Sequence, residues 1–140
     1  MYISDATSQD VPKINTICDN EVSNVNNNCH GIYLDRVYVG QIANNLIFNI
    51  TSHGIYANQV SQFAILALDS NLVYNCTGSG IYTMQTMSFN SVKGNTIYLV
   101  QNGLYLYANN YFSVANFSDN RIFSYSLQGI YCKYLQNTTI

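Results

Sequence analysis

Apolar and polar residues recur along this chain with a period of 23 to 26 residues. The clearest repeat is a motif of a polar residue, glycine, an aliphatic residue and tyrosine. Its glycines are 23, 26, 23 and 26 residues apart. Self-similarity at a period in this range is typical of a solenoid, in which each repeat forms one turn of a coil. The five glycines are Gly31, Gly54, Gly80, Gly103 and Gly129, and each is expected to take a corner conformation with positive φ.

A second motif, which begins with asparagine, alternates with the first. Each leading asparagine precedes the next glycine by nine residues, or by eight in the third copy. A third, looser motif follows each glycine and carries Val39, Phe63, Phe89 and Phe112. Each turn is therefore predicted to hold three short strands separated by polar corners. The copies of the second motif begin at Asn45, Asn71, Asn95 and Asn120.

Alternation within each predicted strand separates inward from outward side chains. If the aliphatic residue after each glycine faces inward, the tyrosine after it faces outward. The second motif likewise alternates an inward aliphatic residue with an outward aromatic one. The expected inward positions are Ile32, Ile55, Ile81, Leu104 and Ile130, then Leu34, Ala57, Thr83, Leu106 and Cys132, and Ile47, Val73, Ile97 and Ile122. The expected outward aromatic residues of the second motif are Phe48, Tyr74, Tyr98 and Phe123.

Helices and antiparallel sheets explain this pattern less well than parallel stacking. No helical periodicity persists past a turn or two, and β-branched and aromatic residues dominate the strand-like segments. In a parallel stack each residue lies about 4.8 Å above its counterpart in the preceding turn. Parallel stacking thus accounts for near-identical residues at matched positions.

The residues from Asn45-Leu46-Ile47 to Gly54-Ile55-Tyr56, with three later copies, resemble the N-x-I…G-I-x repeat of right-handed parallel β-helices in the pectin-lyase-like superfamily. The resemblance covers roughly residues 31–135. It implies an all-β, single-stranded, right-handed parallel β-helix of about five turns. It implies no single activity, because that superfamily includes lyases, hydrolases, epimerases, adhesins, phage tailspikes and surface proteins.

The whole chain, residues 1–140, is expected to be one β-helix segment. Residues 1–29 are predicted to form an irregular first turn or cap, residues 30–135 the regular repeats, and residues 136–140 a tail. The stretch Asp19 to Asn24 resembles a weak copy of the asparagine motif. The last turn, from Gly129, carries no amphipathic cap, and native solenoids cover or pair such an end. Flanking solenoid turns or self-association are therefore the expected partners.

Composition narrows the range of functions. Apolar residues make up 48% of the chain and charged residues only 9%, with a net charge of −2. Five basic residues provide no footprint for nucleic acid and no polybasic membrane patch. No segment approaches the roughly 18 apolar residues of a membrane span. We therefore expect neither a nucleic-acid partner nor membrane insertion.

The four cysteines and two histidines give no metal-binding pattern. Cys18, Cys29, Cys76 and Cys132 lack the pair spacing of a zinc site. Cys18 and Cys29 share a turn and are the one pair able to bridge, although unpaired thiols are the favoured interpretation. His30 and His53 lie one turn apart and are predicted to be exposed corner residues. No metal or cofactor is expected.

Two columns of polar or aromatic side chains are the main candidate sites. The asparagines Asn45, Asn71, Asn95 and Asn120 are predicted to stack as a structural ladder of amide hydrogen bonds. The outward tyrosines form a ridge with three open interpretations: rings stacked on one another, a platform for sugars, or a contact surface for another chain. These candidate binding residues are Tyr33, Tyr56, Tyr82, Tyr105 and Tyr131.

Catalysis within this chain is not favoured. The resemblance implies that an enzyme of this superfamily would carry clustered Asp, Lys or Arg residues on one outer face. Here the charged residues are scattered over different turns, so no catalytic residue is assigned. Asp119 and Arg121 are expected to form a local pair. The scattered residues are Asp35, Arg36, Asp69, Lys93, Asp119, Arg121 and Lys133.

We therefore expect a non-catalytic structural or adhesive β-solenoid module of a surface, secreted or filamentous assembly. The alternative is a carbohydrate-binding or carbohydrate-active β-helix, such as a polysaccharide lyase or hydrolase, with catalytic residues outside this chain. A glycan is then the alternative partner. An extracellular or cell-surface location is expected, with glycosylation candidates at Asn49, Asn75, Asn116 and Asn137.

Overall fold

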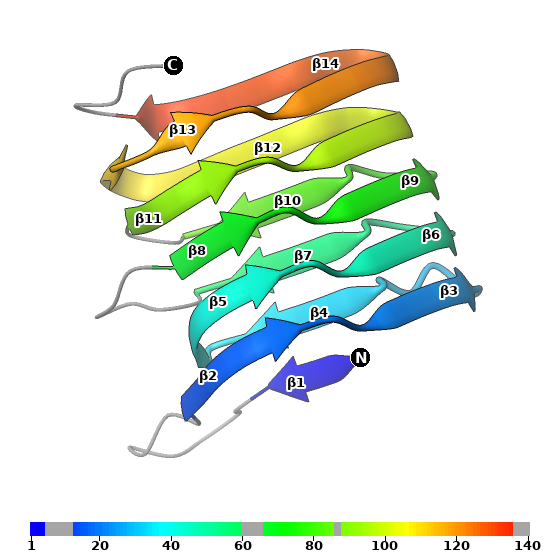
Figure 1. Ribbon diagram of the computed structural model, residues 1–140, viewed down its shortest axis with the longest axis horizontal. Coiled ribbons are helices and arrows are strands. Elements are labelled where there is room, and N and C mark those ends of the chain that lie inside the picture. The colour runs from blue at the N-terminus through cyan, green and yellow to red at the C-terminus, as the bar shows by residue number, and fades with distance from the viewer. Residues whose placement is uncertain (5–12, 60–65, 86–87, 136–140) are drawn as a thin grey trace.

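The computed structural model describes residues 1–4, 13–59, 66–85 and 88–135. Within these residues every regular element is a β-strand, and the strands stack as successive coils of one ribbon (Figure 1). Phe63 and Asn137 lie outside the described residues, as does the side chain of Phe112. The strands are β1 (Tyr2–Ser4), β2 (Lys13–Cys18), β3 (Glu21–Val25), β4 (Ile32–Asp35), β5 (Tyr38–Ala43), β6 (Leu46–Ile50), β7 (Ile55–Asn58), β8 (Leu66–Asp69), β9 (Leu72–Cys76), β10 (Ile81–Met84), β11 (Ser88–Lys93), β12 (Thr96–Val114), β13 (Phe117–Ser118) and β14 (Arg121–Leu135).

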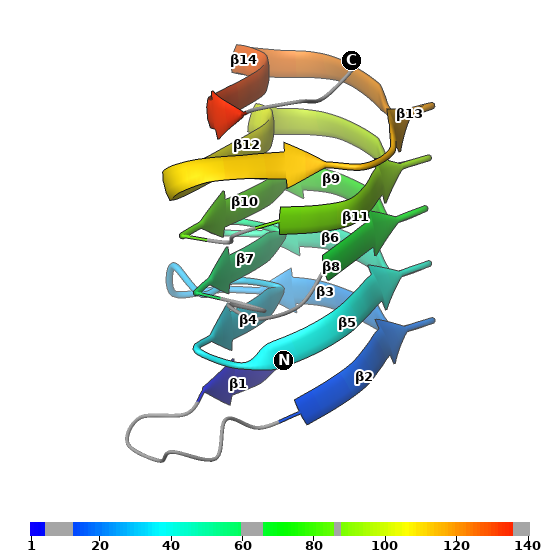
Figure 2. The ribbon, with the colours of Figure 1, turned by 90° about the vertical axis from the view of Figure 1, so that its left-hand side faces the viewer.

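Every strand pairing is parallel and joins one turn to the next. One face of the coil stacks β1, β4, β7, β10, β12 and β14. A second face stacks β2, β5, β8 and β11, and a third stacks β3, β6, β9, β12 and β14 (Figure 2). The expected parallel β-solenoid is confirmed. It completes about four turns rather than five, because the first and last windings are partial.

The register of the strands matches the repeats in the sequence. Ile55 pairs with Ile32 on one side and Ile81 on the other, so the glycine motifs lie in phase. Residues 13–25, expected to be an irregular first turn, pair in the same way, with Val22 beside Ile47. Tyr2 pairs with Tyr33 and adds one more level to that face.

In the last two windings the three expected short strands merge. β12 continues for 19 residues and β14 for 15, bending through the corners instead of breaking there. The two strands stay paired on both sides of the corner, and their register shifts between Val100 and Asn102, where the ribbon bends.

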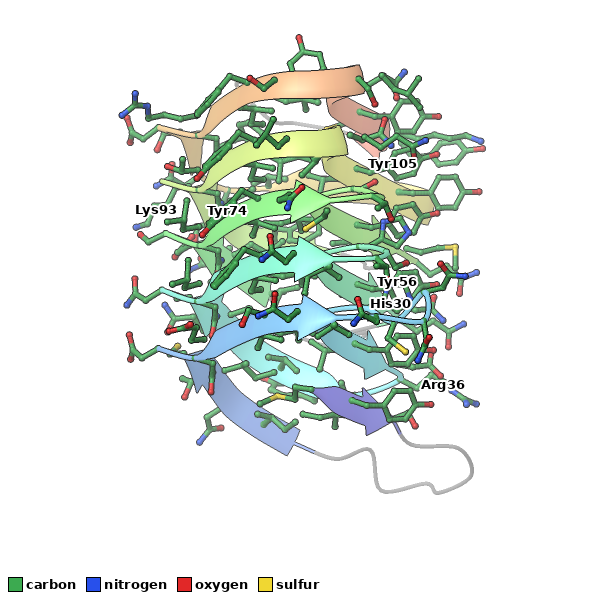
Figure 3. All side chains as sticks on the ribbon, turned by 90° about the vertical axis from the view of Figure 1, so that its right-hand side faces the viewer. His30, Arg36, Tyr56, Tyr74, Lys93 and Tyr105 are labelled. Carbon is green, nitrogen blue, oxygen red and sulfur yellow. The ribbon has the colours of Figure 1, made fainter. Side chains whose placement is uncertain are left out.

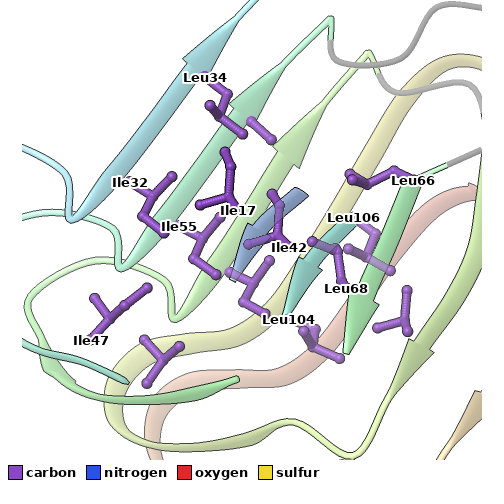
Figure 4. Close-up of a cluster of buried hydrophobic side chains, with 14 of the residues drawn as sticks. Ile17, Ile32, Leu34, Ile42, Ile47, Ile55, Leu66, Leu68, Leu104 and Leu106 are labelled. Atoms are coloured by element: carbon purple, nitrogen blue, oxygen red, sulfur yellow. The ribbon is translucent and has the colours of Figure 1, made fainter. Parts of the chain in front are cut away.

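The interior of the coil is filled by the predicted inward side chains (Figure 4). Ile32, Ile55, Ile81 and Leu104 have no exposed surface. Burial of such side chains stabilises the fold by about 1.5–3 kcal/mol each. Ile130 is 43% exposed because it belongs to the last described turn, so its expected full burial is not observed.

The motif glycines serve a different purpose from the one expected. We predicted positive φ angles, yet among the described residues the only glycine with positive φ is Gly94. A Cβ on Gly31 would instead lie 2.6 Å from the Gly54 carbonyl oxygen and 2.7 Å from the Ile47 side chain. Glycine is required here because neighbouring turns approach too closely for any side chain.

Positive φ angles occur at the corners, on other residues. One such column consists of the residues directly after the outward aromatic position of the asparagine motif. Its φ angles lie between 52° and 56°. Asparagine adopts this left-handed conformation at a lower energetic cost than leucine. The column contains Asn24, Asn49, Asn75, Leu99 and Ser124.

Candidate functional site

The face built from β1, β4, β7, β10, β12 and β14 carries one continuous column of tyrosine rings, which we name the tyrosine face. Successive ring centroids are 4.6, 5.2, 5.4, 4.7 and 4.4 Å apart, and the planes differ by at most 17°. Every pair is therefore stacked face to face. The column comprises Tyr2, Tyr33, Tyr56, Tyr82, Tyr105 and Tyr131.

Stacking decides which part of each ring meets solvent. The ring faces within the column are covered by the rings above and below, so the edges and hydroxyl groups remain for a partner. Partial burial raises the pKa of Tyr56 and Tyr82, so both hydroxyls stay protonated at neutral pH. The tyrosine face thus offers a line of hydrogen-bonding groups rather than open rings on which a sugar stacks.

Two histidines extend this aromatic cluster. The His30 ring lies 4.7 Å from the Tyr56 ring and 5.2 Å from the His53 ring, and His53 stacks on Tyr82 at 4.7 Å. Figure 3 shows His30 beside Tyr56, with Tyr105 on the same side of the coil. We expected exposed corner residues, but both imidazoles are partly buried because they pack against the tyrosine column.

The hydrogen bonds of the histidines fix their protonation. The Nδ1 atom of His53 accepts a hydrogen bond from the Ser79 backbone N–H at 2.9 Å, and the Nδ1 atom of His30 accepts one from His53 at 3.4 Å. Burial, and then the positive charge of His30, lower the pKa of His53 to about 4. His53 is therefore neutral at physiological pH.

A polar column lies beside the tyrosines at the ends of the same strands. Asn58 donates a hydrogen bond to Asp35 at 2.7 Å, and Arg36 pairs with Asp35 at 3.2 Å. At the other end of this column Lys133 lies over the Tyr107 ring at 5.0 Å. Asp35 and Lys133 therefore lie four levels apart in this column.

Inside the corner, the four predicted asparagines form the expected ladder. Each side-chain amide donates to the next Oδ1 at 2.9–3.0 Å. Asn20, which the prediction omitted, adds one more bond to Asn45 at 2.9 Å. The same amides also donate to main-chain carbonyls of the preceding turn, so they satisfy buried backbone groups. The ladder runs through Asn20, Asn45, Asn71, Asn95 and Asn120.

The face built from β3, β6, β9, β12 and β14 carries a second aromatic column. Phe48, Tyr74, Tyr98 and Phe123 stack at 5.1, 4.9 and 5.0 Å. Leu72 is 36% exposed, Leu99 54% and Phe123 46%. We name this surface, visible around Tyr74 in Figure 3, the leucine–aromatic face. It comprises Leu46, Phe48, Leu72, Tyr74, Tyr98, Leu99 and Phe123.

Three of the four glycosylation candidates are described and exposed: Asn49, Asn75 and Asn116. Asn75 donates a hydrogen bond to Asn49 at 2.7 Å, and Asn49 donates one to Asn24 at 3.0 Å. A second, outward ladder therefore joins two of the candidates. The sequence indicated their shared corner position but not this bonding.

The described residues contain no group of three His, Cys, Asp or Glu side chains placed to hold a metal ion. All four cysteines are unpaired, and burial raises the pKa of Cys76 to about 12. The expected pair between Asp119 and Arg121 is not formed; the ion pair within the described part of the chain is Asp35–Arg36. Asp119 sits at a left-handed corner, φ 58°, outside the strand that carries Arg121.

Comparison with known proteins identifies the architecture. A family model described as a right-handed β-helix region matches residues 1–140. No curated protein matches the chain, and no solved structure does either. Among the described residues, no helix has the length and apolar character needed to cross a membrane.

Proposed function

The chain belongs to the right-handed β-helix family, and we propose that it is a non-catalytic structural or adhesive module of a surface, secreted or filamentous assembly. The observation that carries this proposal is the unbroken stack of tyrosine rings from Tyr2 to Tyr131. Such a column is rigid and flat, and it presents uncharged hydroxyl groups at intervals of one turn.

These properties suit contact with a surface. Tyrosine is enriched at protein interfaces because it adds a large contact area and a hydrogen-bonding hydroxyl at a small entropic cost. Stacking fixes the rings before contact, so little side-chain entropy is lost on binding. The tyrosine face is the proposed contact surface, with Tyr33, Tyr56, Tyr82, Tyr105 and Tyr131 as its binding residues.

Further solenoid turns or another copy of the chain are the proposed partners at the end of the coil. Ile130 occupies an inward position but is 43% exposed. A further turn placed on β14 would bury this side chain and pair the outer edge of β14. The exposed Asn116 sequon, between β12 and β13, supports the proposed extracellular or cell-surface location.

Glycan binding is the second candidate function. It is supported by the hydroxyl edges of the tyrosine column next to the polar pair of Asp35 and Asn58. A glycan would then bind through hydrogen bonds along the column, since the ring faces are occupied. In the carbohydrate-active form of this alternative, residues outside this chain supply catalysis.

Removal of hydroxyls from the tyrosine face tests these proposals. The variant Y56F/Y82F/Y105F keeps three stacked rings but loses their hydroxyl groups, while Y38F makes the same change on β5, away from both aromatic columns, as a control. Adhesion of labelled chain is measured on surfaces coated with the chain itself and with neutral or acidic polysaccharides.

Loss of adhesion to the chain itself in the first variant alone supports the structural role. Loss of polysaccharide binding in that variant supports the second candidate. Unchanged adhesion in both variants contradicts the assignment of the tyrosine face. Shortening of any polysaccharide by the purified chain overturns the non-catalytic assignment.

A further inference from the structure

We infer that the leucine–aromatic face pairs with the same face of a second copy of this chain, with the two coil axes antiparallel. This inference rests on the proposed structural role and names one partner and its orientation. It uses a face different from the tyrosine face.

The outermost column of this face has opposite charges at its two ends. Strand register places Glu21 beside Leu46, Leu46 beside Leu72, Leu72 beside Thr96 and Thr96 beside Arg121. Glu21 and Arg121 therefore lie four turns apart, about 19 Å along the axis. Between them the column is uncharged.

Both charged side chains are exposed, and neither forms an ion pair within the described residues. The nearby acidic residues, Asp19 and Asp119, lie at the corner one residue before the ladder asparagines and outside the face. The face thus has an unpaired negative charge at one end and an unpaired positive charge at the other.

Two flat faces related by a two-fold axis have two simple arrangements. If the axis runs along the coil, each residue faces residues of its own level, so Glu21 lies on the level of the second copy's Glu21, and Arg121 on the level of the second copy's Arg121. If the axis runs along the strands, the levels are reversed and Glu21 meets Arg121 at both ends. Only the antiparallel arrangement brings opposite charges together, and like charges disfavour the other.

The centre of the face matches in the same arrangement. Reversal about the middle level places Leu72 opposite Leu72 and Tyr74 opposite Tyr74. Phe48 then lies opposite Tyr98, and both belong to a column whose rings are already fixed by stacking. Pairing would cover Leu72, which is otherwise 36% exposed, against its own copy.

The size of the face limits the affinity. It extends about 19 Å along the axis and about 13 Å along the strands, so two copies bury roughly 500 Å² in total, well below the roughly 1,600 Å² of a standard interface. We therefore expect a weak, transient dimer.

Charge reversal tests the orientation. Sedimentation equilibrium is measured from low micromolar to millimolar concentration for wild type, E21R, R121E and E21R/R121E. Each single variant places like charges opposite each other, so its dimer is expected to weaken about tenfold. The double variant restores both pairs and should dimerise like wild type.

An equimolar mixture of E21R and R121E is the sharpest measurement. The two chains carry opposite charges at both ends, so they should form a heterodimer at least as stable as the wild-type dimer. Recovery in the mixture together with weakening in each single variant is the expected result. A monomeric wild type, or single variants that dimerise like wild type, overturns the inference.

Thiol crosslinking provides a second readout of the two-fold axis. In a C29S background, L72C places two thiols opposite each other at the axis, whereas L46C displaces them by about 10 Å along the coil. A short bifunctional thiol reagent should crosslink L72C and leave L46C monomeric. Equal crosslinking of both variants also overturns the antiparallel pairing.

These outcomes are separate from the test of the proposed function. If the charge substitutions do not change the stability of the dimer, the chains pair through another face. That result would not contradict the proposed structural role. Unchanged adhesion of Y56F/Y82F/Y105F would contradict the tyrosine face without affecting the charge-reversal result.

Discussion

Asn45 donates its side-chain amide to Oδ1 of Asn71 at 2.9 Å, while its backbone N–H donates to the same oxygen at 3.2 Å. One buried amide thus satisfies two donors from the turn before it. Since both asparagines are about 1% exposed, water cannot replace these bonds.

Replacement of Asn71 should therefore be costly. N71A removes the acceptor of the Asn45 backbone N–H and of one Asn45 side-chain N–H, together with the side-chain donor to the Ile42 carbonyl, and each unsatisfied buried group costs about 1–3 kcal/mol. We expect the free energy of unfolding in urea to fall by about 3 kcal/mol or more. N75G, which removes an exposed amide from the outward ladder but keeps the positive φ, should cost less than about 1 kcal/mol. Equal losses in the two variants would contradict a special role for the inner ladder.

The core contains one polar position that the repeat does not need. Thr83 is fully buried, and its hydroxyl has no hydrogen-bond partner among the described residues. Valine has nearly the same shape without the hydroxyl, so T83V should raise the free energy of unfolding by about 1 kcal/mol. T77V, at an exposed corner, should change it by less than about 0.5 kcal/mol. A destabilised T83V would mean that the hydroxyl has a partner.

Leu99 occupies the column of left-handed residues in which three earlier turns have asparagine. Its φ is 52° and its side chain is 54% exposed. L99N should relieve backbone strain and place an amide above Asn75, so we expect stabilisation by about 0.5–1 kcal/mol. L72N, at a strand position on the same face, removes an exposed leucine without this relief. The unfolding midpoint in urea, measured at low micromolar concentration, should rise for L99N alone.

The sequence predicts the ladders well because, in a parallel stack, identical residues at matched positions of successive turns contact each other. It predicts the ends of the ladders poorly. Tyr2 does not follow a glycine as the other tyrosines of its column do, and Asn20 begins only a weak copy of the asparagine motif. Neither residue therefore shows the full repeat pattern. Both join the columns through strand register, which local composition does not determine.

The roles of the glycines and histidines depend on distances between turns, which a one-dimensional pattern does not contain. Gly31 was expected to need a positive φ, but it is required because Gly54 and Ile47 lie so close to it. His53 appeared to be an exposed corner residue, yet the rings of Tyr82 and His30 pack on it. Repetition therefore predicts which residues meet, and the three-dimensional packing decides how much room and solvent they have.

Protonation of His53 should make the fold sensitive to acid. Its pKa is about 4 in the folded chain and about 6.5 when unfolded, so the unfolded state binds more protons between these values. Stability is therefore complete above about pH 6.5 and falls as the pH drops toward 4. The difference corresponds to at most about 3 kcal/mol, and partial exposure of the ring reduces the expected loss to about 2 kcal/mol.

The variant H53N separates this effect from general acid unfolding. Its side-chain oxygen replaces Nδ1 as the acceptor for the Ser79 N–H but does not titrate in this range. The free energy of unfolding in urea is measured at intervals from pH 4 to pH 7.5. Between pH 4 and 6.5 the slope for H53N should be clearly smaller than for wild type, and H30N should retain most of the wild-type slope. Parallel curves for wild type and H53N would show that the His53 imidazole does not control acid stability, because burial lowers the pKa of this group and the variant removes it.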